Sequence, residues 1–271
     1  MTILVTGGTG IVGSRLLRRL ADAGVDCRAL VRAGKKVPAG VTPVEGDILD
    51  PESLPQAVQG VSAIIHLAAL LRSPDTAAIW KVNLEGTRNL IATARLHAPE
   101  ARFIMASTGL VYNPDIPRPA RENDPAAPTA AYPASKLAAE NELRASGLTW
   151  SVLRLGFVYG DGDGHLESAQ QLFSARKWHP AQTLSLLHQR DVATAVELAL
   201  TGATDGRVVN IVDEAPTTVY EIASIVGATM EPSADPLPNP WMGRADGSLA
   251  RSLGFQPTVR TVYQASREGA L

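Results

Sequence analysis

The chain has 271 residues, which allows one large domain or two small ones. Hydrophobic residues make up 45% of the sequence and charged residues 19%, a composition that excludes an intrinsically disordered chain. Twenty-five basic and 27 acidic residues leave a formal net charge of −2, so the charge balance does not favour a nucleic-acid partner.

The N-terminus and the apolar runs predict a cytoplasmic protein that does not enter a membrane. Residues 2–5 begin an apolar segment at once, without the basic region or cleavage site of a signal peptide. The longest apolar stretch, residues 63–71, contains His66 and is too short to span a bilayer. The single cysteine, Cys27, cannot form an internal disulfide, which fits a reducing compartment.

Short apolar runs alternate with amphipathic stretches through the first half of the chain. The pattern predicts helices at residues 11–23, 51–58, 77–97 and 132–145. It predicts strands at residues 3–5, 27–31, 41–44, 63–67, 102–106 and 150–155. Because the strands are apolar throughout and alternate with helices, we expect an α/β fold with a doubly wound parallel sheet of the Rossmann type.

The pattern is looser after Gly156. Helices are predicted at residues 167–175, 191–201 and 219–226, a strand at 208–212, and a proline-rich extended loop at 230–245. We predict a sheet domain over residues 1–155 and a small C-terminal α/β lobe over residues 156–271. The two are expected to be interleaved, because no flexible linker separates them.

Residues 6–13, TGGTGIVG, join the first predicted strand to the first helix. Gly7, Gly10 and Gly13 allow a tight turn, close approach to a pyrophosphate and close packing of helix on strand. Ile11 opens the helix, whose free N–H groups and positive dipole end attract a phosphate. Glycines also serve plain turns, but their position between strand and helix favours a dinucleotide-binding domain.

The end of the second strand indicates which dinucleotide is bound. NAD sites usually place an acidic residue there for the ribose 2′-hydroxyl. This chain has Arg32 instead, which can pair with a 2′-phosphate, so NADP is predicted, with NAD as the alternative. Arg32 can also be read as a solvated loop charge. Asp47 and Ile48 follow the third strand, where an adenine ring is expected, although Asp47 can instead cap the next helix.

Tyr132 and Lys136 are four residues apart in a predicted helix and therefore share one face. A free phenol has a pKa of about 10. A neighbouring ammonium favours the phenolate, and we expect Lys136 to move the pKa of Tyr132 towards the working range of a general acid/base.

Other candidate residues follow the ends of two predicted strands. Ser107 and Thr108 end the fifth strand, and Ala68 and Ala69 follow the fourth. Carboxyl ends of parallel strands meet at one edge of a sheet, where ligands bind. We therefore expect Thr108 to face a substrate oxygen there and Ala68 and Ala69 to lie against the cofactor.

The chain resembles the extended short-chain dehydrogenase/reductases, also called the NAD(P)-dependent epimerase/dehydratase family. Segments that match the family occur in the expected order along nearly the whole chain: TGGTGIVG (6–13), GDILD (46–50), HLAAL (66–70), VNLEGTRNL (82–90), ASTGLVY (106–112), YPASK (132–136), LRLGFVYG (153–160), HQRDVATAVELAL (188–200) and NIVDEAPTTVYEIA (210–223).

The resemblance implies a role for each matching residue. Tyr132 matches the general acid/base, and Lys136 matches the residue that binds the nicotinamide ribose. Thr108 matches the hydroxyl that polarises the substrate oxygen, and Ser107 a neighbouring, usually non-catalytic serine on the substrate side. Asn83 matches an asparagine that helps hold the active site. The implied chemistry is hydride transfer between nicotinamide C4 and a carbonyl or alcohol carbon. A homodimer formed through residues 77–97 and 132–145 is also implied.

Two departures from the family pattern bear on the substrate. Phe157 stands where members that act on nucleotide sugars often have an asparagine, and Arg32 stands where NAD-dependent members have an acid. Both favour an NADPH-dependent carbonyl reductase with a small-molecule substrate. A nucleotide-sugar epimerase or dehydratase with tightly bound NAD is the alternative. A non-catalytic NADP-sensing regulator ranks lower, because Tyr132 and Lys136 are both present. The histidines show no metal-ligand spacing, so no metal site is predicted.

Overall fold

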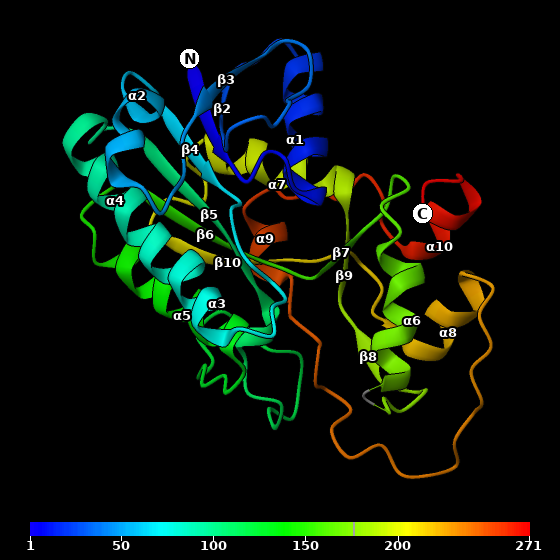
Figure 1. Cartoon of the computed structure of the whole chain (residues 1–271). Helices are drawn as coiled ribbons and strands as arrows, with labels where there is room; N and C mark the ends of the chain where they lie inside the picture. The colour runs from blue at the N-terminus through cyan, green and yellow to red at the C-terminus, as the bar shows by residue number, and fades with distance from the viewer. Residues whose placement is uncertain (176) are drawn as a thin grey trace.

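A computed structural model describes residues 1–175 and 177–271. Its centre is a seven-stranded parallel sheet with the strand order β10-β6-β5-β4-β1-β2-β3 (Figure 1). The strands of this sheet are β1 (Thr2–Thr6), β2 (Asp26–Val31), β3 (Val41–Glu45), β4 (Ala63–His66), β5 (Arg102–Thr108), β6 (Trp150–Leu155) and β10 (Arg207–Ile211).

Helices cover both faces of the sheet, which confirms the predicted doubly wound fold. Alternate residues of a strand point to opposite faces. Ile3 and Val5 accordingly pack into one core layer and Leu4 into the other. The first layer lies beneath α1 (Ile11–Asp22), α7 (Gln189–Leu200) and α9 (Ser248–Ser252), the second beneath α2 (Pro55–Val58), α4 (Gly86–His97) and α5 (Ala131–Arg144).

The helix predicted over residues 77–97 is helical throughout but not uniformly α-helical. It consists of α3 (Thr76–Trp80), a π-helical turn η2 (Lys81–Glu85) and α4. A π turn widens the helix locally and commonly marks a functional position. Here the turn contains Asn83, whose buried side chain has partners outside its own helix.

Segments beyond residue 155 contribute to the sheet as well as to a smaller lobe. β10 pairs with β6, and α7 packs against α1. The lobe lies on the side of the C-terminus in Figure 1 and encloses its own apolar core. It contains β7 (Phe157–Tyr159), β8 (Thr183–Leu184), β9 (Leu186–His188), β11 (Thr217–Thr218), α6 (His165–Ala175), α8 (Val219–Ile225) and α10 (Val262–Arg267).

Two short 3-10 helices, η1 (Pro51–Ser53) and η3 (Gly109–Val111), follow the third and fifth strands of the sheet. Residues 230–245 contain neither a helix nor a strand, as their prolines predict. Within the described part of the chain, no helix has the length and apolar character needed to cross a membrane.

Candidate functional site

The glycine turn between β1 and α1 is shaped by close backbone contacts. Gly7 has a φ of +74°, and a Cβ there would come within 2.6 Å of the Ala68 nitrogen. A Cβ at Gly13 would overlap the Gly7 carbonyl oxygen. Among the described residues, no side chain caps the N-terminus of α1, and its first turn contains no acidic residue. These features fit a site for the pyrophosphate of a dinucleotide at the helix N-terminus.

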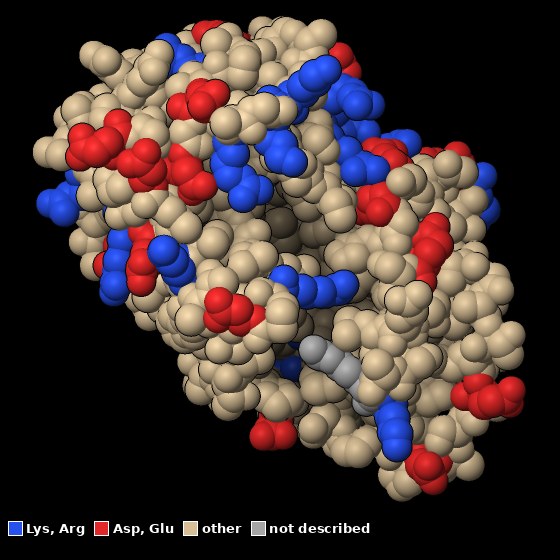
Figure 2. Space-filling view, in the orientation of Figure 1, with Lys and Arg blue, Asp and Glu red and all other residues tan. Residues whose placement is uncertain are grey.

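Three predicted cofactor contacts lie at the ends of β2 and β3. Arg32 follows β2 directly and is exposed. The Asp47 side chain stabilises the turn in which it lies, because its Oδ1 accepts a hydrogen bond of 2.9 Å from the Leu49 nitrogen. The side chain of Ile48 is buried beneath α4, close to Gly86, so it packs within the protein core. Figure 2 shows several Lys and Arg side chains beside a hollow in this face of the molecule.

Thr108 and Tyr132 belong to elements that pack against each other. Thr108 ends β5, and its Oγ1 accepts a hydrogen bond of 3.2 Å from the Leu110 nitrogen at the start of η3. Tyr132 is in the first turn of α5, which packs against η3. The helix that bears Tyr132 therefore packs against the segment that directly follows Thr108. Lys136, one turn further along α5, is 1% exposed.

Burial dominates the titration of the Tyr132–Lys136 pair. It raises the pKa of Tyr132 to about 12, so the expected lowering of this pKa by Lys136 is wrong for the protein alone. Burial also lowers the pKa of Lys136 to about 8, against the opposing charge of Glu140. Tyr132 is therefore a protonated phenol at neutral pH.

Asn83 joins the π turn to the start of α5. Its Nδ2 donates hydrogen bonds of 3.0 Å to Ser135 Oγ and 3.1 Å to the Leu70 oxygen. Its Oδ1 accepts a hydrogen bond of 2.7 Å from the Leu70 nitrogen. Ser135 in turn donates to the Tyr132 carbonyl oxygen at 2.7 Å. These bonds fix the segment after Ala69 relative to the turn that carries Tyr132.

His66 is buried at the end of β4, and its hydrogen bonds settle its tautomer. The Thr87 hydroxyl donates to the Asn83 carbonyl oxygen at 2.6 Å, so it accepts from His66 Nε2 at 2.9 Å. His66 Nδ1 consequently accepts from the Thr6 hydroxyl at 2.7 Å. Burial lowers the pKa of His66 to about 3. His66 therefore serves as a buried neutral link between Thr6 and Thr87.

Ser107 uses its hydroxyl within the protein rather than for the predicted substrate contact. The hydroxyl donates to Glu140 of α5, whose carboxylate also forms a buried ion pair with Arg154 of β6 at 2.6 Å. Sequence reasoning missed Glu140 and Arg154. Two signals were available, because Arg154 interrupts an apolar strand and Glu140 is four residues after Lys136.

Phe157 lies on β7, where the lobe begins. Its ring stacks on His165 with a centroid distance of 4.5 Å, and its backbone nitrogen donates to the Ser185 oxygen at 2.9 Å. His165, His179 and His188 each bond a backbone carbonyl oxygen. In the described ranges, no group of three or more His, Cys, Asp or Glu side chains is arranged to hold a metal ion.

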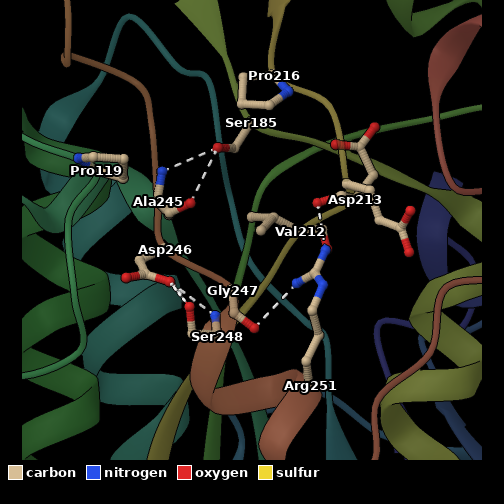
Figure 3. A pocket seen from close by; sticks show the side chains of 11 residues that line it. Pro119, Ser185, Val212, Asp213, Pro216, Ala245, Asp246, Gly247, Ser248 and Arg251 are labelled. Carbon is tan, nitrogen blue, oxygen red and sulfur yellow. Dashed lines mark hydrogen bonds between the residues drawn. The ribbon is translucent and has the colours of Figure 1, made fainter.

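A cavity of about 340 Å³ opens beside Ser185, at the carboxyl end of β10 (Figure 3). Most of its polar side chains bond the cavity wall itself. Ser185 accepts from the Ala245 nitrogen at 3.0 Å, and Arg251 donates to the Gly247 and Asp213 oxygens at 3.0 and 2.8 Å. None of the predicted catalytic residues lines it. The cavity residues are Pro119, Ser185, Val212, Asp213, Glu214, Pro216, Ala245, Asp246, Gly247, Ser248 and Arg251.

Comparison with known families and characterised proteins agrees with this architecture. A family model described as the NAD dependent epimerase/dehydratase family matches residues 3–212. A ketoreductase of Stigmatella aurantiaca, which acts on a farnesyl-dihydroquinoline oxide, is 30% identical over 298 residues, covering 100% of this chain and 88% of its own.

Two further relatives are matched over part of their length. Ceramide reductase of Caulobacter vibrioides is 30% identical over 70% of this chain, and UDP-glucose 4-epimerase of Azospirillum brasilense is 34% identical over 58%. The matches span 58% and 49% of those two proteins.

Solved structures share the fold. UDP-glucose 4-epimerase of Thermus thermophilus, in complex with NAD, has a TM-score of 0.76 at 27% identity, with 96% of this chain and 94% of that one covered. A short-chain dehydrogenase/reductase superfamily protein of Agrobacterium tumefaciens with bound NAD has a TM-score of 0.81 at 23% identity, covering 99% and 95% of the two chains.

Proposed function

Because the chain belongs to the NAD-dependent epimerase/dehydratase family, an enzymatic family, we propose that it is an NADPH-dependent carbonyl reductase with an apolar substrate. One observation carries the proposal. The helix α5, whose first turn bears Tyr132, packs against β5, which ends at Thr108, and against η3, which follows it at the carboxyl edge of the sheet.

The residues around the glycine turn fit a dinucleotide. At Gly7 and Gly13 the backbone of the turn packs too closely for a side chain, and the N–H groups of Ile11 and its neighbours lie at the start of α1, where a pyrophosphate would bind. Arg32 is exposed where a ribose 2′-phosphate is expected, which favours NADP over NAD. Ala68, Ala69 and the Asp47–Ile48 backbone complete the proposed site. A bound nicotinamide cofactor supplies the hydride.

The side chains at the site suit the reducing direction. The Tyr132 phenol, with a pKa of about 12, holds its proton at neutral pH and can donate it to a carbonyl oxygen. Thr108 donates its hydroxyl proton in a hydrogen bond to the same oxygen. Asn83 and Ser135 hold the turn that carries Tyr132. Lys136, protonated below about pH 8, provides the ammonium that binds the cofactor ribose.

Apolar groups near the site favour an apolar substrate. Leu110, two residues after Thr108, is 56% exposed, and Phe157 places a ring at the start of the lobe. Two relatives with reductase activity are described by lipid-like substrates, a farnesylated quinoline oxide and ceramide. We expect the same substrate class here.

A nucleotide-sugar epimerase is the second candidate, because the Azospirillum relative and the Thermus structure are UDP-glucose 4-epimerases. The experiment that separates the two follows absorbance at 340 nm with NADPH and a panel of long-chain or ring-containing ketones, and assays UDP-glucose without added cofactor. A reductase consumes NADPH with a ketone. An epimerase converts the sugar with no net consumption.

A further inference from the structure

The ammonium of Lys136 has an unusual environment. Its side chain is 1% exposed, and among the described residues no hydrogen bond or ion pair joins it to a protein group. A buried ammonium without an anion nearby loses its proton readily. The proposed function needs the charged form.

One carboxylate lies on the same face of α5. Glu140 is one helical turn after Lys136, is fully buried, and counters the lowering of the Lys136 pKa by burial. Other titratable groups around this part of α5 are Tyr132 on the helix itself, His66 from β4, Arg154 from β6, Tyr112 after η3 and Glu122 in the following loop. His66 is neutral at working pH because of its low pKa, and Tyr112 is neutral because burial raises its pKa to about 12.

The Glu140 carboxylate is held by groups other than Lys136. Arg154 Nε donates to both carboxylate oxygens at 3.1 and 3.2 Å, and Nη2 donates to Oε2 at 2.6 Å. The Ser107 hydroxyl donates to Oε1. The guanidinium lies over the Tyr112 ring, 4.8 Å from its centroid, and Tyr112 donates to Asn210 at 2.6 Å.

We propose that Glu140 is a positioning residue that keeps Lys136 charged for cofactor binding without binding it. Arg154 and Ser107 donate hydrogen bonds to both oxygens of the Glu140 carboxylate. The N–H groups of the Lys136 ammonium therefore stay available to donate to a ligand. The negative charge still acts on Lys136 through the low-dielectric interior. Ser107 precedes Thr108 in β5, so the same contacts fix the strand end relative to α5. The inference rests on the proposed function for the identity of that ligand.

The test measures Lys136 in the protein without ligand. NMR titration of the lysine side-chain Cε signals, with the Lys136 signal assigned from Lys136→Arg, is compared for the wild type and Glu140→Gln. We expect the midpoint to fall by about one pH unit or more in Glu140→Gln, because the neutral amide leaves Lys136 near an unpaired Arg154. Glu142→Gln is the matched control, because this exposed carboxylate lies on the same helix and pairs with Arg88. The Lys136 midpoint in Glu142→Gln should equal that of the wild type.

Binding experiments extend the test to the proposed function. NADPH affinity is followed by fluorescence from pH 6 to 9. At pH 8 the affinity of Glu140→Gln should be about tenfold lower than that of the wild type, whereas at pH 6 the two proteins should bind NADPH equally well. In a Lys136→Arg background the same substitution should not change the pH dependence. If Glu140→Gln does not fold, the double variant Glu140→Gln/Arg154→Gln serves instead, because it removes both charges of the buried pair, and the Lys136 midpoint should fall by less than in the single variant.

The outcomes are separable. An unchanged Lys136 midpoint in a folded Glu140→Gln protein overturns the inference, even if the melting temperature falls. A shifted midpoint in a protein that binds no dinucleotide supports the electrostatic role and contradicts the proposed function instead.

Discussion

The side-chain amide of Asn83 donates a hydrogen bond of 3.0 Å to the Ser135 hydroxyl, across the contact between the π turn and α5. The Ser135 hydroxyl in turn donates a hydrogen bond to the carbonyl oxygen of Tyr132. The Thr87 hydroxyl is hydrogen-bonded to both the Asn83 carbonyl oxygen and His66. The residue proposed to move the proton is therefore tied through buried polar groups to the end of β4, which adjoins the glycine turn.

Removal of the Asn83 side chain should destabilise the protein and displace the start of α5. Asn83→Ala loses three hydrogen bonds and leaves the Leu70 amide and carbonyl without their partner. We expect the free energy of unfolding to fall by about 2 to 4 kcal/mol in urea denaturation. Asn141→Ala, an exposed position on α5, is the control and should change it by less than about 0.5 kcal/mol. Equal stabilities for the two variants would contradict the role of Asn83.

Arg32 should decide the choice between the two dinucleotides. Arg32→Ala removes the guanidinium expected to pair with the 2′-phosphate, so NADPH should bind about tenfold or more weakly while NADH binding stays unchanged. Calorimetric titration with both cofactors measures the ratio. Arg95→Ala removes an exposed arginine from the far end of α4 and should leave the ratio as in the wild type. A ratio unaffected by Arg32→Ala would show that this arginine is a solvated loop charge.

The pH dependence of reduction should reflect Lys136. Its pKa is lowered to about 8, so kcat/KM for carbonyl reduction should fall as pH rises through about 8, because the ammonium loses its proton there. Tyr132 stays protonated over this range, and His66, with a pKa of about 3, adds no titration between pH 5 and 9. In Lys136→Arg the decline should move beyond pH 10, because a guanidinium does not titrate there. Steady-state profiles from pH 6 to 10 measure this, and a flat wild-type profile to pH 10 is the contrary outcome.

Asp161 should connect the proposed cofactor helix to the lobe. Its carboxylate pairs with Arg19 of α1 and Arg190 of α7, each at 2.9 Å, and its φ is +52°. Asp161→Asn removes the charge while keeping a side chain that tolerates this backbone conformation. We expect a loss of about 1 kcal/mol in urea denaturation that shrinks at high salt, because these pairs are partly exposed. A loss independent of salt would assign the effect to packing.

The sequence predicts the sheet and its glycine turn well because both depend on local pattern. Residues 3–5 lie in β1 and residues 11–22 form α1, and in both segments the spacing of apolar residues along the chain is enough to indicate the element. The short strands β7, β8, β9 and β11 could not be predicted, since two or three residues carry no periodicity. β10 was predicted as a strand, but its place beside β6 is set by long-range pairing.

In the candidate site, too, features set by local sequence could be predicted and features set by long-range packing could not. The spacing of Tyr132 and Lys136 predicts a shared helix face, which the structure has. The direction of the Tyr132 pKa shift was wrong, because burial depends on packing that a motif does not contain. Ser107 illustrates the same limit, since its partner Glu140 is 33 residues away in the chain.

Deuteride transfer tests the central claim most directly. The protein is incubated with NADPH that carries deuterium at C4 and with a ketone from the apolar panel, and the product is examined by mass spectrometry. The account predicts an alcohol with one deuterium on the carbinol carbon, formed by the wild type and reduced at least about 100-fold in Tyr132→Phe, while NADPH binding is retained. Deuterated product formed equally fast by Tyr132→Phe, or no transfer from NADPH by a wild type that converts UDP-glucose instead, would contradict it.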